Sequence, residues 1–264
     1  MKPRVLSLFA GIGGFDLGLE RAGMEVVGQC EIDPFCRQVL RKHWPDCWQW
    51  DDVRTLTGDV VREHCGQVDV ICGGYPCQPF AQCGKRLGTD DERHLWPECL
   101  RLLCDLRPKF ALFENVRGHL SLGLDAVLSD LAGIGFDAEW TLLSASALGA
   151  PHQRLRLFLV AYPKRIGHDS FPHEMGIGSP SELSGAWRQT RATLGYDCPR
   201  IGGQSYGMPV DWRMADGVSP DLEDAARRVK ALGNAIVPQC AEWVGRCVIR
   251  ALADSAQVEG AGSR

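Results

Sequence analysis

The sequence lacks a long apolar segment: none of its 264 residues belongs to an uninterrupted apolar run of about 18 residues, so no membrane span is predicted. Its first residues lead directly into a strand-like run, without the pattern of a signal peptide. Twelve cysteines are present, but no two have the C-x-x-C spacing of many zinc and redox sites. We therefore expect reduced thiols, no metal site and a cytoplasmic protein.

Basic residues are not in excess either. The net charge is −4, which argues mildly against a nucleic acid as partner. The charge is uneven, however, since residues 152–213 hold eight Lys and Arg against five Asp and Glu. If the protein binds DNA, this segment is the better candidate, although a solvated surface of mixed charge explains the asymmetry nearly as well.

The first 160 residues or so alternate short apolar runs with helical patterns. Strand-like runs occur at residues 5–9, 24–30, 68–72, 110–113 and 155–161, and helical patterns occur at 15–22, 34–44, 97–104 and 124–134. Strands that alternate with helices predict an α/β fold with a doubly wound, mostly parallel sheet.

The composition changes after Tyr162, where Gly, Pro, Ser and Arg become frequent and periodicity is lost. We expect a main domain at 1–162, a small irregular lobe at 163–220, a helical segment at 221–253 that returns to the main domain, and a disordered tail at 254–264. A disordered linker is the alternative for the lobe, but Trp187 and Trp212 argue against it.

A glycine-rich loop, Phe9-Ala10-Gly11-Ile12-Gly13-Gly14, joins the first predicted strand to the first predicted helix. Glycines there let a ligand approach the backbone, and the helix N-terminus offers amide donors. Glu31 follows the second strand, where a carboxylate accepts hydrogen bonds from ribose hydroxyls, and Asp52 is a candidate for reading an adenine amino group. The third glycine of the dinucleotide fingerprint is missing, so NAD is disfavoured. The alternative is a packing turn with two surface acids.

Cys77 lies in the rigid turn Gly73-Gly74-Tyr75-Pro76-Cys77-Gln78-Pro79-Phe80, after a predicted buried strand. Two prolines fix the backbone on either side of the thiol, a presentation that suits a nucleophile. A buried structural cysteine explains this stretch alone equally well.

Three charged residues lie near predicted strand ends. Glu114 closes a strand, where partial burial would raise the pKa of its carboxyl group and suit it to donate a proton. Arg154 and Arg156 alternate with Leu155, so we expect both to point from one face of a strand into the same cleft. A surface acid and an exposed edge strand are the alternatives. Gly233-Asn234 predicts a sharp turn, to which the residues alone assign no role.

In this order, these pieces resemble the DNA (cytosine-5)-methyltransferases of bacteria and their phages. The resemblance spans residues 5 to about 245 and rests on residues 6–14, Glu31, Asp52, Pro76-Cys77-Gln78, Glu114-Asn115-Val116, Arg154-x-Arg156 and Gly233-Asn234. It implies a Rossmann-like methyltransferase that methylates double-stranded DNA, with 1–162 as catalytic domain and 163–220 as target-recognition region.

The resemblance also implies a role for each site residue. Cys77 would attack carbon 6 of a flipped-out cytosine, Glu114 would hold ring nitrogen 3 through a proton, and Arg154 and Arg156 would hold the cytosine carbonyl. Gln78, Lys85 and Arg86 would contact DNA. The cofactor S-adenosyl-L-methionine would be bound by Phe9, Gly11, Gly13, Glu31, Ile32, Asp52, Val53, Pro76, Asn234 and Ile236.

The sequence departs from the family pattern at Ser7, where an acid is common, and at His152, where a glutamine is common. Two rivals stay open: a transfer RNA methyltransferase of the same fold, and a catalytically silent DNA-binding homologue. A nicotinamide oxidoreductase is a distant third. We expect a monomer without membrane or metal partners; the target sequence and the presence of a cognate restriction endonuclease are not determined by the sequence.

Overall fold

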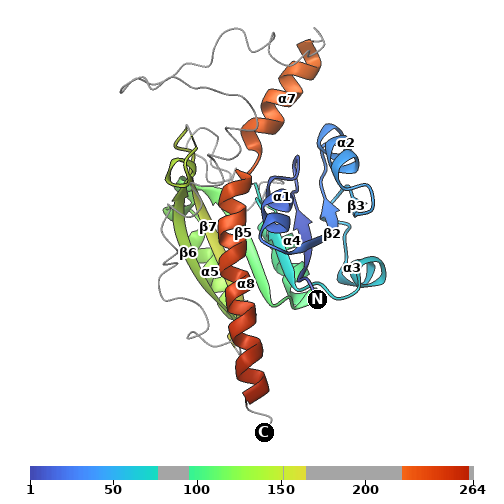
Figure 1. Cartoon of the computed structure of the whole chain (residues 1–264). Helices are drawn as coiled ribbons and strands as arrows, with labels where there is room; N and C mark the ends of the chain where they lie inside the picture. The colour runs from blue at the N-terminus through green and yellow to red at the C-terminus, as the bar shows by residue number, and fades with distance from the viewer. Residues whose placement is uncertain (77–94, 151, 165–221, 262–264) are drawn as a thin grey trace.

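The computed structural model describes residues 1–76, 95–150, 152–164 and 222–261, with the backbone alone for 222–226 and 255–261. A seven-stranded sheet forms its centre, in the order β3-β2-β1-β4-β5-β7-β6 (Figure 1). The strands are β1 (Arg4–Leu8), β2 (Glu25–Cys30), β3 (Trp48–Trp50), β4 (Val70–Gly73), β5 (Phe110–Val116), β6 (Phe136–Ser144) and β7 (Leu155–Pro163). The first five strands pair in parallel, and β7 runs antiparallel between β5 and β6. The predicted α/β fold with a mostly parallel sheet is confirmed.

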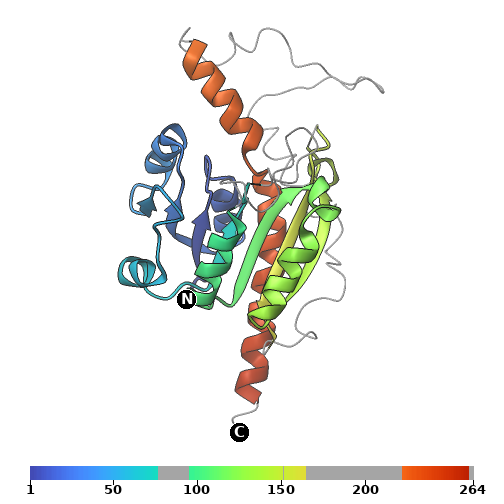
Figure 2. The same ribbon diagram turned by 180° about the vertical axis from the view of Figure 1, so that it is seen from behind.

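Helices cover both faces of this sheet. They are α1 (Gly14–Arg21), α2 (Pro34–His43), α3 (Gly58–Cys65), α4 (Trp96–Leu106), α5 (Leu124–Gly133), α7 (Leu222–Asn234) and α8 (Pro238–Ala261), with the short 3-10 turns η2 (Arg117–Leu120) and η3 (Ala145–Leu148). Figure 1 shows α1 and α8 in front of the strands, and Figure 2 shows the opposite face with α4 and α5. Buried side chains accordingly form two apolar cores, one between the sheet and α1 and α8, the other between the sheet and α3, α4 and α5.

Local sequence explains several element boundaries. Along β1, Val5 belongs to the core beneath α1 and α8, whereas Leu6 and Leu8 belong to the opposite core, as strand alternation requires. The side chain of Asp33 accepts hydrogen bonds from the first amides of α2, and Pro34 occupies the first helical turn. Thr57 caps α3 through the amide of Val60 in the same way. Capping and alternation therefore fix where these elements begin and which face they bury.

Helices α1 and α8 pack closely because glycines line their contact. A side chain on Gly14 would collide with the carbonyl of Ile236, and one on Gly18 would meet Pro238 and the side chain of Ala241. Gly245 of α8 makes the reciprocal approach to α1. The predicted C-terminal helical segment thus lies against the first helix of the chain, and its N-terminus reaches the glycine-rich loop that precedes α1.

The strand order changes direction between β1 and β4, which is where open α/β sheets bind ligands. The carboxyl ends of the five parallel strands share one edge, and antiparallel β7 begins there. Segments that are far apart in sequence therefore meet at this edge, which we call the site edge.

The structure differs from the sequence prediction in some elements. The strands β3 and β6 and the helix α3 were not predicted; β6 is an edge strand of mostly half-buried residues, so its periodicity is weak. Helix α8 extends to Ala261, into the range for which we expected a tail. Within the described ranges, no helix has the length and apolarity needed to cross a membrane.

Candidate functional site

The glycine-rich loop at the end of β1 has an unusual backbone. Phe9, Gly11 and Gly13 all have positive φ values, of 52°, 56° and 86°. A side chain at Gly13 would also collide with Trp44, so this position requires glycine for two reasons. Phe9 holds the left-handed conformation without that freedom, a strain that typically collects at functional sites. The loop is therefore held in one particular conformation at the start of α1.

Glu31, at the end of β2, is anchored to this loop. One carboxylate oxygen accepts a hydrogen bond from the amide of Gly11 at 2.7 Å, and the other accepts one from the amide of Asp33 at 2.8 Å. A carboxylate has about four acceptor positions, so two are left for a ligand. The neighbouring Ile32 is 63% exposed, an apolar surface beside the acid that suits a flat ring. Both residues thus offer a hydrogen-bond acceptor and an apolar surface side by side at the β2 strand end.

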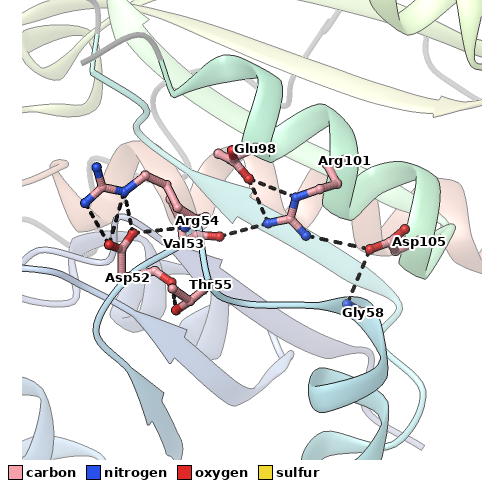
Figure 3. Close-up of polar contacts among 8 residues, drawn as sticks. All are labelled: Asp52, Val53, Arg54, Thr55, Gly58, Glu98, Arg101 and Asp105. Carbon is pink, nitrogen blue, oxygen red and sulfur yellow. Dashed lines mark hydrogen bonds and ion pairs between the residues drawn. The ribbon is translucent and has the colours of Figure 1, made fainter. Parts of the chain in front are cut away.

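Asp52 follows β3 at the same edge. Both of its carboxylate oxygens accept hydrogen bonds from the Arg54 side chain, the shortest at 2.7 Å (Figure 3). These hydrogen bonds are the main cause that lowers the pKa of Asp52. Val53 is buried, and its carbonyl accepts a hydrogen bond from Arg101 of α4. Asp52 is consequently a charged acceptor on a loop whose next residue belongs to the core.

The chain leaves β4 through Gly74, Tyr75 and Pro76 towards Cys77. Tyr75 is buried: its hydroxyl lies 2.8 Å from Nε2 of His119, and its carbonyl accepts a hydrogen bond from Asn115. Its ring also packs against Trp96 at a centroid distance of 5.2 Å. Because Tyr75 is held from three sides, the backbone that leads to Cys77 starts from a fixed point. Four predicted site residues lie outside the described ranges: Cys77, Gln78, Lys85 and Arg86.

Glu114 lies near the end of β5, two residues before its last residue, and its side chain is almost fully buried. One carboxylate oxygen is 3.0 Å from Nε of Arg156, at the start of β7. The other faces Gly74, at 3.2 Å from where a side chain there would begin. Burial raises the pKa of Glu114, and the nearby Arg156 and Arg154 partly oppose that shift. The site edge therefore holds a buried carboxyl group that retains a proton more readily than an exposed acid does.

The expectation that Arg154 and Arg156 share one face of a strand is wrong, although both arginines lie close enough to Glu114 to lower its pKa. Arg154 precedes β7, with a φ of 32°, and its guanidinium donates hydrogen bonds to the carbonyls of Gly233 and Ala235 at 2.8 and 2.6 Å. Its buried Nε atom has no hydrogen-bond partner among the described residues. Of the two arginines, Arg156 is the one that forms an ion pair with Glu114 in the described part of the chain. The reason is the left-handed backbone at Arg154, which breaks the strand alternation and turns its side chain towards the α7–α8 connection.

The predicted turn at Gly233-Asn234 ends α7, and Asn234 is exposed there. Ile236 follows it: its backbone abuts Gly14 at the start of α1, and its side chain lies near Gly74 after β4. The α7–α8 connection thus touches both the glycine-rich loop and the segment that leads to Cys77. These contacts join three segments that the sequence placed in separate motifs.

Comparison with known proteins decides the family. A family model described as C-5 cytosine-specific DNA methylase matches residues 3–183, which is more than half of the chain. The chain belongs to this family. The predicted resemblance is therefore confirmed, and with it the assignment as a DNA cytosine-5 methyltransferase.

Individual relatives agree. The Type II methyltransferase M.NgoMIV of Neisseria gonorrhoeae is 30% identical over 94% of this chain and 97% of its own length. The Type II methyltransferase M.HgiCII of Herpetosiphon aurantiacus is 35% identical over 64% of this chain. The solved structure of a DNMT2 mutant from Spodoptera frugiperda is 26% identical, with a TM-score of 0.55 over 66% of this chain. The chain spans nearly all of M.NgoMIV, but 39% of M.HgiCII and 53% of the DNMT2 chain.

The structure adds residues to the site that the sequence analysis did not single out. Tyr75 with His119, and Arg101 with Val53, contact site segments across more than 40 residues of sequence. Neither His119 nor Arg101 belongs to a motif that the sequence analysis singled out. The one sequence signal for such a residue was Tyr75 itself, directly before Pro76, because a buried tyrosine hydroxyl requires a hydrogen-bond partner.

Proposed function

We propose that this protein transfers a methyl group from S-adenosyl-L-methionine to carbon 5 of a flipped-out cytosine in double-stranded DNA, through a covalent adduct with Cys77. The observation that carries the proposal is the buried Glu114 carboxyl group, paired with Arg156 and facing the segment that leads to Cys77. An acid whose pKa is raised by burial suits proton donation during addition of a thiol to an electron-poor ring.

The first three strand ends fit the proposed cofactor. Glu31 has acceptor positions left for ribose hydroxyls, and Ile32 offers an exposed apolar surface to the adenine ring. Asp52 is an acceptor for the adenine amino group, next to the backbone of Val53. Phe9, Gly11, Gly13, Pro76, Asn234 and Ile236 would complete the pocket. S-adenosyl-L-methionine would supply an electrophilic methyl group on a sulfonium centre.

The protein groups would act on the cytosine in turn. The Cys77 thiolate forms a bond to carbon 6, and Glu114 gives its proton to ring nitrogen 3, so that the electron pair released by the addition becomes available at carbon 5. Arg156 keeps the Glu114 carboxyl oriented while its charge changes. After carbon 5 has accepted the methyl group, a base removes its proton and the electron pair expels Cys77 as thiolate.

The remaining predicted residues would serve the DNA. Gln78, Lys85 and Arg86 follow the catalytic turn, where side chains would hold the phosphate backbone and the position left by the flipped base. Arg154 would act indirectly, by holding the α7–α8 connection against the site edge.

Bisulfite sequencing of DNA from a methylation-free bacterial host tests the proposal. The host expresses the wild type, Cys77→Ala or, as a matched control, Cys104→Ala, which changes an exposed cysteine of α4. We expect protected cytosines in one short sequence context with the wild type and the control, and none with Cys77→Ala. Protection that persists in Cys77→Ala would refute the nucleophile. Methylation confined to RNA, or no protection from well-expressed wild type, would refute the DNA substrate.

A further inference from the structure

Helix α4 is hydrogen-bonded to the loop that carries Asp52. Arg101, in the middle of α4, donates a hydrogen bond from Nη2 to the carbonyl of Val53 at 2.9 Å (Figure 3). The guanidinium is itself oriented by two acids of the same helix, Glu98 at 2.7 Å and Asp105 at 3.7 Å. Three groups therefore determine where this guanidinium lies, so the Val53 carbonyl meets a pre-oriented donor.

The end of the same loop, where α3 begins, is also hydrogen-bonded to α4. The amide of Gly58, which begins α3, lies 3.4 Å from a carboxylate oxygen of Asp105. A side chain at Gly58 would begin 2.5 Å from Cβ of Asp105, so the two backbones pack without room for one. Arg62 of α3 adds a hydrogen bond to the Asp105 carbonyl at 2.8 Å. The loop between β3 and α3 is thus held by α4 at both ends.

The position of Asp52 follows from that of Val53. The side chains of Val53 and Leu56 are buried, while Asp52 and Arg54 lie on the outer side of the loop. The carbonyl of Asp52 accepts hydrogen bonds from the amide and the hydroxyl of Thr55, so residues 52–55 form one tight turn. A turn of this kind moves as a unit. The contact from Arg101 to Val53 therefore sets the position of this turn, within which the amide and side chain of Arg54 orient the Asp52 carboxylate.

We propose that Arg101 is a positioning residue that fixes Asp52 for reading the adenine amino group of the cofactor, and so makes cofactor selection depend on α4. The inference rests on the proposed role of Asp52. Arg101 touches no reacting atom in this scheme: its effect on the nucleoside passes through the loop, by the Val53 carbonyl and by Asp105, which holds the Gly58 amide.

Calorimetric binding of two ligands tests this role: S-adenosylhomocysteine and its inosine counterpart, which presents an oxygen where adenine has its amino group. The proteins are the full-length wild type, Arg101→Met and the control Arg62→Met. Methionine keeps an apolar stem of similar length but removes the guanidinium. Each variant loses an arginine that donates a hydrogen bond to a backbone carbonyl. The carbonyl belongs to Val53 for Arg101 and to Asp105 of α4 for Arg62.

We expect the wild type to prefer the adenosyl ligand by about 100-fold, because the inosyl oxygen would face a carboxylate. Arg101→Met should reduce that preference to about tenfold or less by weakening adenosyl binding, since it frees the acceptor from its pre-oriented position. Arg62→Met should keep the wild-type preference. A merely structural role of Arg101 would weaken both ligands equally and leave the ratio unchanged.

The outcomes separate the two claims. If the wild type binds both ligands equally, the proposed role of Asp52 fails and this inference fails with it. If the wild type discriminates and Arg101→Met discriminates equally, Asp52 keeps its role and the inference about Arg101 is overturned. Should Arg101→Met not fold, Arg101→Lys retains the charge but not the forked geometry, and an unchanged ratio there overturns the inference too.

Discussion

Asp16, in the first turn of α1, is a fully buried carboxyl group held by polar side chains of the sheet. One oxygen accepts a hydrogen bond from Ser7 of β1 at 3.0 Å, and the other accepts one from Gln29 of β2 at 2.7 Å. Gln49 of β3 extends this chain by donating to Gln29. Burial outweighs these hydrogen bonds and raises the pKa of Asp16 from its ordinary 3.8 to about 6. We therefore predict that Asp16→Asn makes the protein more stable at neutral pH.

The magnitude follows from linkage. Between about pH 4 and pH 6, the folded protein holds a proton on Asp16 that the unfolded chain has lost, so the free energy of unfolding falls as the pH rises. A pKa raised by about 2 units corresponds to about 3 kcal/mol, and about half of it is lost between pH 5 and pH 7.5. An asparagine amide at this position accepts from Gln29 and donates to Ser7 without titrating. Asp16→Asn should thus gain about 1.5 kcal/mol on the wild type across that interval.

Urea denaturation followed by tryptophan fluorescence, at about pH 5 and about pH 7.5, measures this gain. The difference between variant and wild type at each pH cancels the titration of all other carboxyl groups. Glu63→Gln is the control, because it removes an exposed acid of α3 that is not among the groups acting on Asp16 and should give the same difference at both pH values. A difference between Asp16→Asn and the wild type that does not change with pH would refute the reasoning, since the buried carboxyl would then not titrate in this interval.

Two further substitutions test the contacts around the α7–α8 connection. Arg154→Met should lower the free energy of unfolding by about 2 kcal/mol in urea denaturation, because two carbonyls lose charged donors; unchanged stability together with lost methylation would instead support the direct substrate contact that the sequence suggested. Gly18→Ala should lower the melting temperature, at a cost of about 1–3 kcal/mol, since the added methyl group meets Pro238 and Ala241. Its control, Gly133→Ala in α5, has open space and should be neutral or stabilising, and equal effects of the two would contradict the packing argument.

Much of the fold was predictable because buried strands and amphipathic helices have strong apolar patterns. The strands β1, β2, β4, β5 and β7 and the helices α1, α2, α4 and α5 were predicted to within a few residues, apart from the longer β5. The missed strands lie at the two edges of the sheet, where half-exposed residues such as Trp48 and Trp140 blur the alternation. A pattern in sequence reports burial, so it fades where burial is partial.

The site was predictable where a residue follows directly from its own strand. Glu31 and Glu114 could be placed at one edge because each lies near the end of a predicted parallel strand, whereas β3, which Asp52 follows, was not predicted. The partner of Arg154 could not be predicted, because its contacts with Gly233 and Ala235 depend on a left-handed backbone and on the docking of α8. The roles of Cys77 and its neighbours stay predictions from the family resemblance.

The family, the α/β alternation and the chemical types at the strand ends can be read from the sequence, because they depend on local pattern and on order along the chain. Which charges meet depends on the folded structure: Arg156 with Glu114, Arg154 with the α7–α8 connection, and Arg101 with the loop of Asp52. A hydrogen bond requires atoms within about 3 Å, and the packing of remote segments sets that distance, whereas sequence spacing does not encode it.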